Sequence, residues 1–165
     1  MKFSEMEIYN WTEKENYSFE FITDTFDVYW LNFKEKEEHF TNFCSDCKDI
    51  YEIEIKQLKG NKRKSNDIKI KNTILSILEE VMSNRCHSIV YVCDDSDGKA
   101  KCRELLFEKY YEEIEDEKKI EKFVKSMCDD ELADCISLNF IADKNCENYE
   151  NNATDFMCQH IEIEE

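Results

Sequence analysis

Alternating apolar and polar positions mark the first third of the chain as a group of β-strands. Residues 17–21 alternate aromatic and polar side chains, which is the period of a strand. A polar turn follows, and residues 26–33, rich in aromatic and β-branched side chains, complete a predicted hairpin. Residues 50–58 alternate isoleucine with glutamate and predict a third strand. We expect residues 1 to about 15 to be loosely packed.

Helical periodicity begins after this third strand. Residues 68–83 form the clearest amphipathic helix of the chain, because their apolar side chains recur at helical spacing. A continuous apolar run at 89–93 then predicts a central strand that is covered on both faces. The stripe of the helix consists of Ile70, Ile74, Ile77, Leu78 and Val81.

The last third of the chain carries weaker patterns. We predict a second helix at about 101–114, a short helix at 120–128, a strand at 135–142 and a terminal helix at 148–162. The whole chain, 1–165, is then a single α+β domain. Its mixed sheet would consist of an antiparallel three-strand meander followed by helix, strand, helix, strand and helix. A helical crossover after the meander favours parallel pairing of the next strand.

A net charge of −17 narrows the classes of partner. Phosphate backbones are bound by Lys and Arg, so we expect no direct binding of nucleic acid. The charge suits solubility, and it also suits an acidic mimic that blocks a nucleic-acid-binding protein. We expect a protein partner, for which the negative charge allows a basic surface, and no membrane, since no apolar run is long enough to span a bilayer.

The nine cysteines are scattered along the chain. Because no leader peptide is recognisable, we expect a cytoplasmic protein with reduced thiols, most of them in the core. Cys44 and Cys47 form a lone CxxC pair, which we interpret as two loop thiols and not as a zinc site, for which four ligands are needed. A catalytic cysteine remains an open alternative, with a partner among His39, His87 and His160.

Acidic and basic residues crowd the loop after the predicted central strand. Ligands of α/β sheets favour this position, at the carboxyl end of a strand. Lys99 and Arg103 lie at the predicted start of the next helix, where they indicate either an anion site or a simple balance of the loop's acids. Calcium is disfavoured because Cys93 would be the first ligand, so we expect no metal. The loop itself contains Asp94, Asp95, Asp97 and Gly98.

Several short segments resemble a family of uncharacterised small bacterial proteins. The resemblance rests on residues 70–74 (IKNTI), 89–94 (IVYVCD), 96–99 (SDGK), Arg103 and 106–107 (LF). Tyr110 and Tyr111 stand where that family tends to have Trp-Phe, and Lys99 stands where it has Arg. The family has no assigned activity, so the resemblance implies a fold and no mechanism.

The predicted topology is also similar to the core of the GNAT acyltransferases. In those proteins acyl-CoA lies against the loop between the last meander strand and the next helix, and a glycine-rich turn binds its pyrophosphate. Here that loop is 59–71, the one basic stretch, but it contains only Gly60. The similarity implies that Lys62, Arg63 and Lys64 bind phosphate, with Arg103 as a further candidate. Lys99 is a phosphate-binding candidate because of its place at the predicted helix start.

Three functions therefore remain as hypotheses. The first is a non-enzymatic acidic interaction domain without a cofactor, which binds a protein partner. The second is a GNAT-like protein that binds acyl-CoA or another phosphate ligand, and only this reading would make the chain an enzyme. The third is the acidic mimic of nucleic acid. No Walker loop, GxGxxG, HExxH or GxSxG motif favours any other enzyme class.

Overall fold

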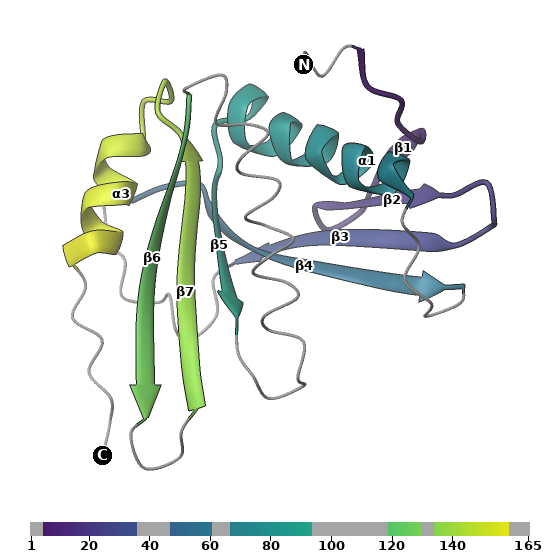
Figure 1. Cartoon of the computed structure of the whole chain (residues 1–165). Helices are drawn as coiled ribbons and strands as arrows, with labels where there is room; N and C mark the ends of the chain where they lie inside the picture. Colours follow the sequence, from purple (N-terminus) through teal and green to yellow (C-terminus); the bar gives the residue numbers. More distant parts are fainter. Residues whose placement is uncertain (1–4, 36–46, 61–66, 94–118, 130–133, 159–165) are drawn as a thin grey trace.

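A computed structural model describes residues 5–35, 47–60, 67–93, 119–129 and 134–158 (Figure 1). These residues form one mixed sheet of seven strands with helices packed on it, so the fold is α+β as expected. The strand order is β1-β2-β3-β4-β5-β7-β6. The strands are β1 (Trp11–Lys14), β2 (Ser18–Ile22), β3 (Val28–Glu35), β4 (Ile50–Lys59), β5 (Ser88–Cys93), β6 (Ile120–Asp129) and β7 (Asp134–Asp143).

Strands β1, β2, β3 and β4 are antiparallel, and each pairs with the next one in the sequence. Helix α1 (Ile68–Glu79) then connects β4 to β5. The pairing of β5 with β4 is parallel, as the helical crossover predicted. One turn of π-helix, η3 (Glu80–Asn84), extends α1 and brings the helical segment to the length that the apolar stripe indicated. The C-terminal helix is α3 (Tyr149–Cys158).

Two expectations about secondary structure were wrong. Residues 120–128, predicted as a short helix, belong to strand β6, which pairs antiparallel with β7 along its whole length. The N-terminal segment is not loosely packed throughout, because Trp11–Lys14 forms the edge strand β1 and Tyr9 is buried. The predicted helix at 101–114 lies outside the described residues.

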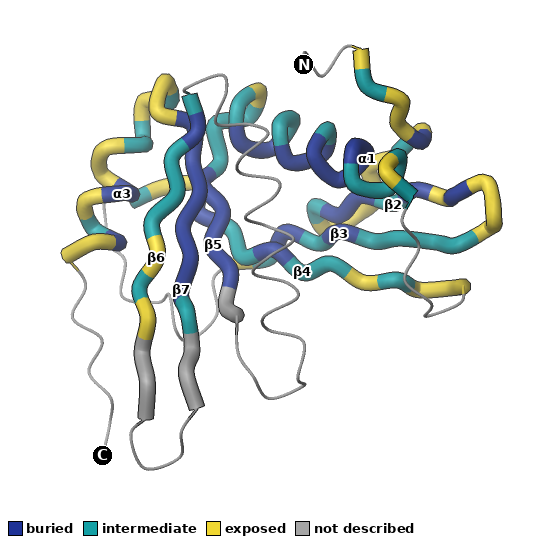
Figure 2. The backbone as a smooth tube through the Cα atoms, in the orientation of Figure 1, coloured by how far each residue is buried: buried dark blue, intermediate teal, exposed yellow. Residues whose placement is uncertain are grey.

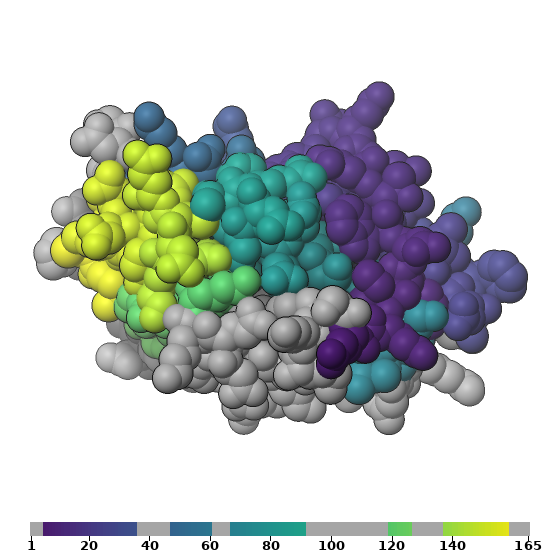
Figure 3. Space-filling view, turned by 90° about the horizontal axis from the view of Figure 1, so that it is seen from above, coloured from purple at the N-terminus to yellow at the C-terminus, as the bar shows by residue number. Residues whose placement is uncertain are grey.

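The sheet buries apolar side chains on both faces. Figure 2 shows buried positions along α1, β5 and β7. On one face α1 packs against β2, β3 and β4, with Phe19, Leu31 and Leu75 fully buried. On the other face α3 packs against β5 and β7 through Val90, Phe140 and Phe156. Strand β5 contributes to both clusters, since Ile89 and Tyr91 join the first, which confirms a central strand covered on both faces. Figure 3 shows α1 between the N-terminal segment and α3.

A disulfide ties the start of β5 to the start of α3. It joins Cys86 to Cys146, which are 60 residues apart in the sequence, and Cys47 is also disulfide-bonded. The expectation of reduced thiols is therefore wrong for these three residues. The sequence analysis predicted no pairing, because Cys86 precedes β5 and Cys146 follows β7, and these strands are neighbours only in the folded sheet. Cys158 is a free cysteine and is exposed.

Candidate ligand site where β4 and β5 diverge

The predicted site residues themselves cannot be placed. Lys62, Arg63 and Lys64 lie outside the described residues, and so do Lys99 and Arg103. The same is true of the loop after the central strand, with Asp94, Asp95, Asp97 and Gly98. What the structure does describe is the framework on each side of the basic stretch, from the end of β4 to the first turn of α1.

Strands β4 and β5 are parallel neighbours that pair over a short distance. Only three residue pairs join them, and the last is Glu52 with Val90, although β4 continues to Lys59. Ser88 N–H donates to the carbonyl of Asp49 (2.8 Å), so alternate β4 residues from Asp49 onward turn their backbone groups toward β5. Past the last pair, the N–H and C=O of Ile55 have no strand partner on this side within the described ranges. Among the described residues, the divergence therefore leaves the backbone groups of Ile55 without a strand partner on the β5 side.

The end of β4 departs from a regular ladder with β3. Val28 pairs with Lys59 and Tyr29 with Gln57, so Leu58 is an extra residue on β4. Such a bulge bends a strand and redirects its side chains. Leu58 is half exposed as a result, at the edge of the basic stretch.

Gly60 holds the chain tightly against the β2–β3 turn. Its φ is +120°, and a Cβ at this position would lie 1.8 Å from Asp27 Oδ1. Only glycine accommodates both conditions, because it lacks the Cβ. Gln57 Nε2 also reaches Asp27 Oδ1 (3.5 Å), so the turn and the end of β4 are fixed to each other.

The first turn of α1 already carries an anion of its own. Asp67 is the N-cap, and its Oδ1 accepts from the N–H of Lys69 (2.9 Å). The hydroxyl of Tyr9 donates to Asp67 Oδ2 (2.5 Å), and this hydrogen bond together with burial raises the pKa of Tyr9 to about 12. Lys69 Nζ lies 4.5 Å from the centre of the Tyr9 ring. A second anion at this helix start would meet both the Asp67 carboxylate and the Lys69 ammonium.

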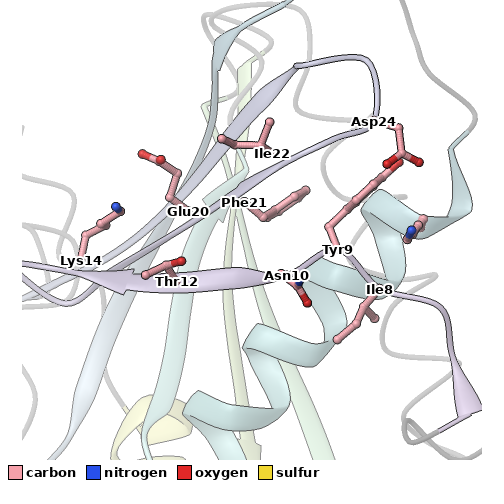
Figure 4. Close-up of a pocket in the computed structure, with 10 residues that line it drawn as sticks. Ile8, Tyr9, Asn10, Thr12, Lys14, Glu20, Phe21, Ile22 and Asp24 are labelled. Carbon is pink, nitrogen blue, oxygen red and sulfur yellow. The ribbon is translucent and has the colours of Figure 1, made fainter.

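A surface pocket of about 470 Å³ adjoins this helix start (Figure 4). It lies between the N-terminal segment, strands β1 and β2, and the first turn of α1. Its lining carries charges of both signs, since Lys14 and Lys69 are positive and Glu20 and Asp24 are negative. Apolar contact comes from Ile8, Phe21 and Ile22. The mixture gives the pocket no net preference for an anion.

A second polar cluster at the opposite end of β4 was not foreseen. The hydroxyl of Tyr17 lies 2.6 Å from His87 Nδ1, and Arg85 bonds both Glu13 (2.8 and 2.9 Å) and Glu80 (3.0 Å). Burial lowers the pKa of His87 and raises that of Tyr17, so the Tyr17 hydroxyl keeps its proton and can donate a hydrogen bond to a neutral imidazole. His87 was a candidate partner of a catalytic cysteine, but no sequence signal joins it to Tyr17, which lies 70 positions away.

This cluster does not supply a catalytic cysteine. Cys86 precedes His87, but its sulfur is bonded to Cys146, so it cannot serve as a thiolate nucleophile. His39 and His160 lie outside the described residues, as does Cys44 of the CxxC pair, and the interpretation of Cys47 as a loop thiol is wrong. Among the described residues, no three His, Cys, Asp or Glu side chains gather as a metal site would require.

Membrane insertion through a helix also finds no support in the described segments, where no helix is both long and apolar enough to cross a bilayer.

Comparison with known proteins identifies the family of this chain. No curated protein matches the sequence. The sequence model of a family of unknown function, DUF6169, matches residues 66–158. That range begins beside the Asp67 cap and extends through α1, β5, β6 and β7 to the last residue of α3, which is more than half of the chain. The protein therefore belongs to the DUF6169 family of unknown function.

Proposed function

We propose that this chain binds acyl-CoA or another phosphate-bearing ligand along β4, where β5 diverges from it. The observation that carries the proposal is the short parallel pairing of these strands, which ends after three residue pairs. Ligands of open sheets with parallel strands favour the carboxyl ends of those strands, and α1 leaves β4 at this end. The parallel step through α1 also supports the resemblance to the GNAT acyltransferases.

The backbone of β4 past its last pair with β5 suits the pantetheine arm of CoA. That arm is an extended chain with two amide groups, so it can hydrogen-bond to Ile55 as a neighbouring strand would. When bound, acyl-CoA would supply an activated thioester. The described residues of this chain would orient the arm along β4 and exclude water through the apolar side chains of Ile53 and Ile55, which belong to the core under α1.

The phosphate end of the ligand fits less simply. Lys59, Lys69 and Lys71 supply positive charge around the basic stretch, and Lys62, Arg63 and Lys64 add more. Asp67 opposes them, because its carboxylate already bonds the first-turn N–H of Lys69. We infer that Asp67 weakens the binding of a phosphate at this helix start and that the lysines outweigh it.

Thermal unfolding with and without acetyl-CoA tests the proposal. A ligand at 100 times its dissociation constant adds about 2.7 kcal/mol to the free energy of unfolding. For a chain of this size, we expect the midpoint to rise by roughly 5–10 °C. No rise with protein shown to be folded, at millimolar acetyl-CoA, would refute acyl-CoA binding. Pantetheine and ADP, tested separately, show which half of the molecule is recognised.

Two variants locate the site by calorimetric titration. Asp67→Asn keeps a good N-cap and removes one negative charge, so acetyl-CoA should bind about two to five times more tightly. Replacing Lys62, Arg63 and Lys64 with Gln should weaken acetyl-CoA and leave pantetheine unchanged. Lys144→Gln, on the far side of the sheet after β7, is the matched control and should change neither. An unchanged affinity in both site variants would place the ligand elsewhere.

A second candidate is a non-enzymatic interaction domain that binds a protein partner. Large apolar side chains are exposed where the meander meets α1, notably Phe26 (81 % exposed) and Ile68 (67 %). Partner capture with wild type and Phe26→Ser, each washed at low and high salt, separates the readings. A partner bound by this surface resists salt and is lost in the variant. An acidic mimic of nucleic acid loses its basic partner at high salt and keeps it in the variant.

A further inference from the structure

Strand β6 forms one edge of the sheet. It is ten residues long (Ile120–Asp129), and β7 is its neighbour on the inner side. In Figure 1 it stands in front of the other strands, and no described element lies before it. Within the residues that the structure describes, no strand pairs with the outer side of β6. An edge of this length is a template for pairing with another chain.

The direction of the backbone groups shows which residues would pair. Lys144 N–H donates to the carbonyl of Lys119 (2.7 Å), so Lys119 faces β7. Backbone groups alternate along a strand, so the odd-numbered residues of β6 face β7 and the even-numbered ones face outward. In the first part of β6, the residues whose backbone N–H and C=O groups face outward are Ile120, Lys122, Val124 and Ser126.

Charge along β6 is self-complementary about one residue. Glu121 and Lys125 lie at equal distances from Phe123, one on each side. If two copies pair antiparallel with the two-fold axis at Phe123, Glu121 of each copy faces Lys125 of the other. In the same register, Lys122 faces Val124 of the other copy, and both are outward residues, as the ladder requires.

We propose that two copies of this chain associate through their β6 strands, antiparallel and centred on Phe123. The interface is isologous, because each copy contributes the same edge. One sheet then runs through both copies, and the outer N–H and C=O groups of β6 are hydrogen-bonded. This association goes beyond the proposed ligand site, which lies on β4, with β5 and β7 between it and β6.

Neighbouring registers are disfavoured by the same lysines. A two-fold axis at Lys122 or at Lys125 places two ammonium groups directly opposite each other, which is destabilising in a sheet. An axis at Val124 places Lys125 opposite Phe123, and its opposite-charge pair, Lys119 with Asp129, lies only at the ends of the strand. Lysines on an edge strand ordinarily discourage pairing, and here they leave one register in which the charges match.

The side chains around the axis also suit a second copy. Val124 is 44 % exposed although it is β-branched and apolar, and pairing would cover it with the Lys122 methylenes of the other copy. Phe123, the residue on the proposed axis, is partly buried and packs against Phe140 at a ring-centroid distance of 6.2 Å. Lys125 already lies over the Phe156 ring at 5.1 Å, a contact that fixes its position on the α3 face of the sheet.

Sedimentation equilibrium of the whole chain tests the proposal. We expect the wild-type protein to be a dimer at micromolar concentration. Lys125→Glu opposes two carboxylates across each half of the interface and should weaken the dimer at least about tenfold. The double variant Glu121→Lys/Lys125→Glu restores opposite charges and should recover the dimer. Lys14→Glu, on the other edge strand β1, is the matched control and should leave the dimer unchanged.

Val124→Pro provides an independent test. The N–H of Val124 faces outward, so proline there spares the ladder with β7 and removes two hydrogen bonds from the dimer interface. We expect a folded monomer, as judged by circular dichroism. A monomeric wild type, or a dimer that survives both Lys125→Glu and Val124→Pro, would overturn the proposal. So would a folded double variant that stays monomeric.

Discussion

Asn152 provides the sharpest test of how α3 is held on the sheet. Its side chain is fully buried, and its Nδ2 donates to the carbonyl of Lys48 (2.8 Å) and to Ser88 Oγ (3.1 Å). Its Oδ1 accepts from the N–H of Lys48 (3.3 Å). We therefore expect Asn152→Ala to destabilise the protein by removing three hydrogen bonds at once.

The magnitude follows from what is left behind. The Lys48 carbonyl keeps a partner, because Asn148 also donates to it (3.2 Å). The Lys48 N–H and the buried Ser88 hydroxyl lose theirs, and a buried group without a partner costs about 1–3 kcal/mol. Because Lys48 is exposed and water can reach it, we expect a total loss of about 2–4 kcal/mol.

Urea unfolding followed by circular dichroism measures this loss. Asn151→Ala is the matched control, since Asn151 is the exposed neighbour on the same helix and gains the same helix propensity from alanine. The control should remain within about 0.5 kcal/mol of wild type. If Asn152→Ala were as stable as Asn151→Ala, the buried amide would not hold α3, and the reasoning would be refuted.

Two further predictions concern the start of β5. Replacing Cys86 and Cys146 with Ser should lower the free energy of unfolding by about 4 kcal/mol, because the bond closes a loop of 60 residues; Cys158→Ser is the control, and equal urea midpoints would contradict the prediction. Burial lowers the pKa of His87, so the unfolded chain binds its proton first, and stability should fall as the pH drops below about 6.5. Unfolding of His87→Gln against pH checks this, since the variant should lack the decline in that window.

The alternation of side chains predicted the inner strands well because each of them packs on a core. In β4, Ile53 is buried and Ile55 partly buried under α1, as the pattern with glutamate indicated. The run in β5 is buried on both faces, where its continuous apolar character has a direct use. These strands have a pattern that a sequence can display, because burial dictates it.

The edge strands could not be predicted in this way. In β6, Phe123 and Val124 are adjacent apolar residues on opposite faces, and with Met127 they imitate the spacing of a helix. Tertiary pairing with β7 decides the structure there, over ten residue pairs. Strand β1 has three exposed residues of four, so it carries no periodicity to detect.

The candidate site depends on the divergence of β4 and β5, which no short sequence motif encodes. Basic residues at 59–71 indicated a phosphate ligand. The early end of the β4–β5 pairing could not be predicted in the same way, because it depends on the position of β5, which also pairs with β7. The sequence shows the negative charge of Asp67 at the helix start, but not its role. The structure shows that Asp67 caps the helix, because its carboxylate accepts a hydrogen bond from the N–H of Lys69.

Ligand binding and self-association use separate parts of the same sheet. The proposed ligand lies along β4, and the proposed dimer forms at β6, with β5 and β7 between them. Lys125→Glu should therefore leave the acetyl-CoA affinity unchanged while it dissociates the dimer. If Lys125→Glu lowered the acetyl-CoA affinity as well as dissociating the dimer, β5 would have to transmit the change. Strand β5 pairs with β4 on one side and with β7, the partner of β6, on the other.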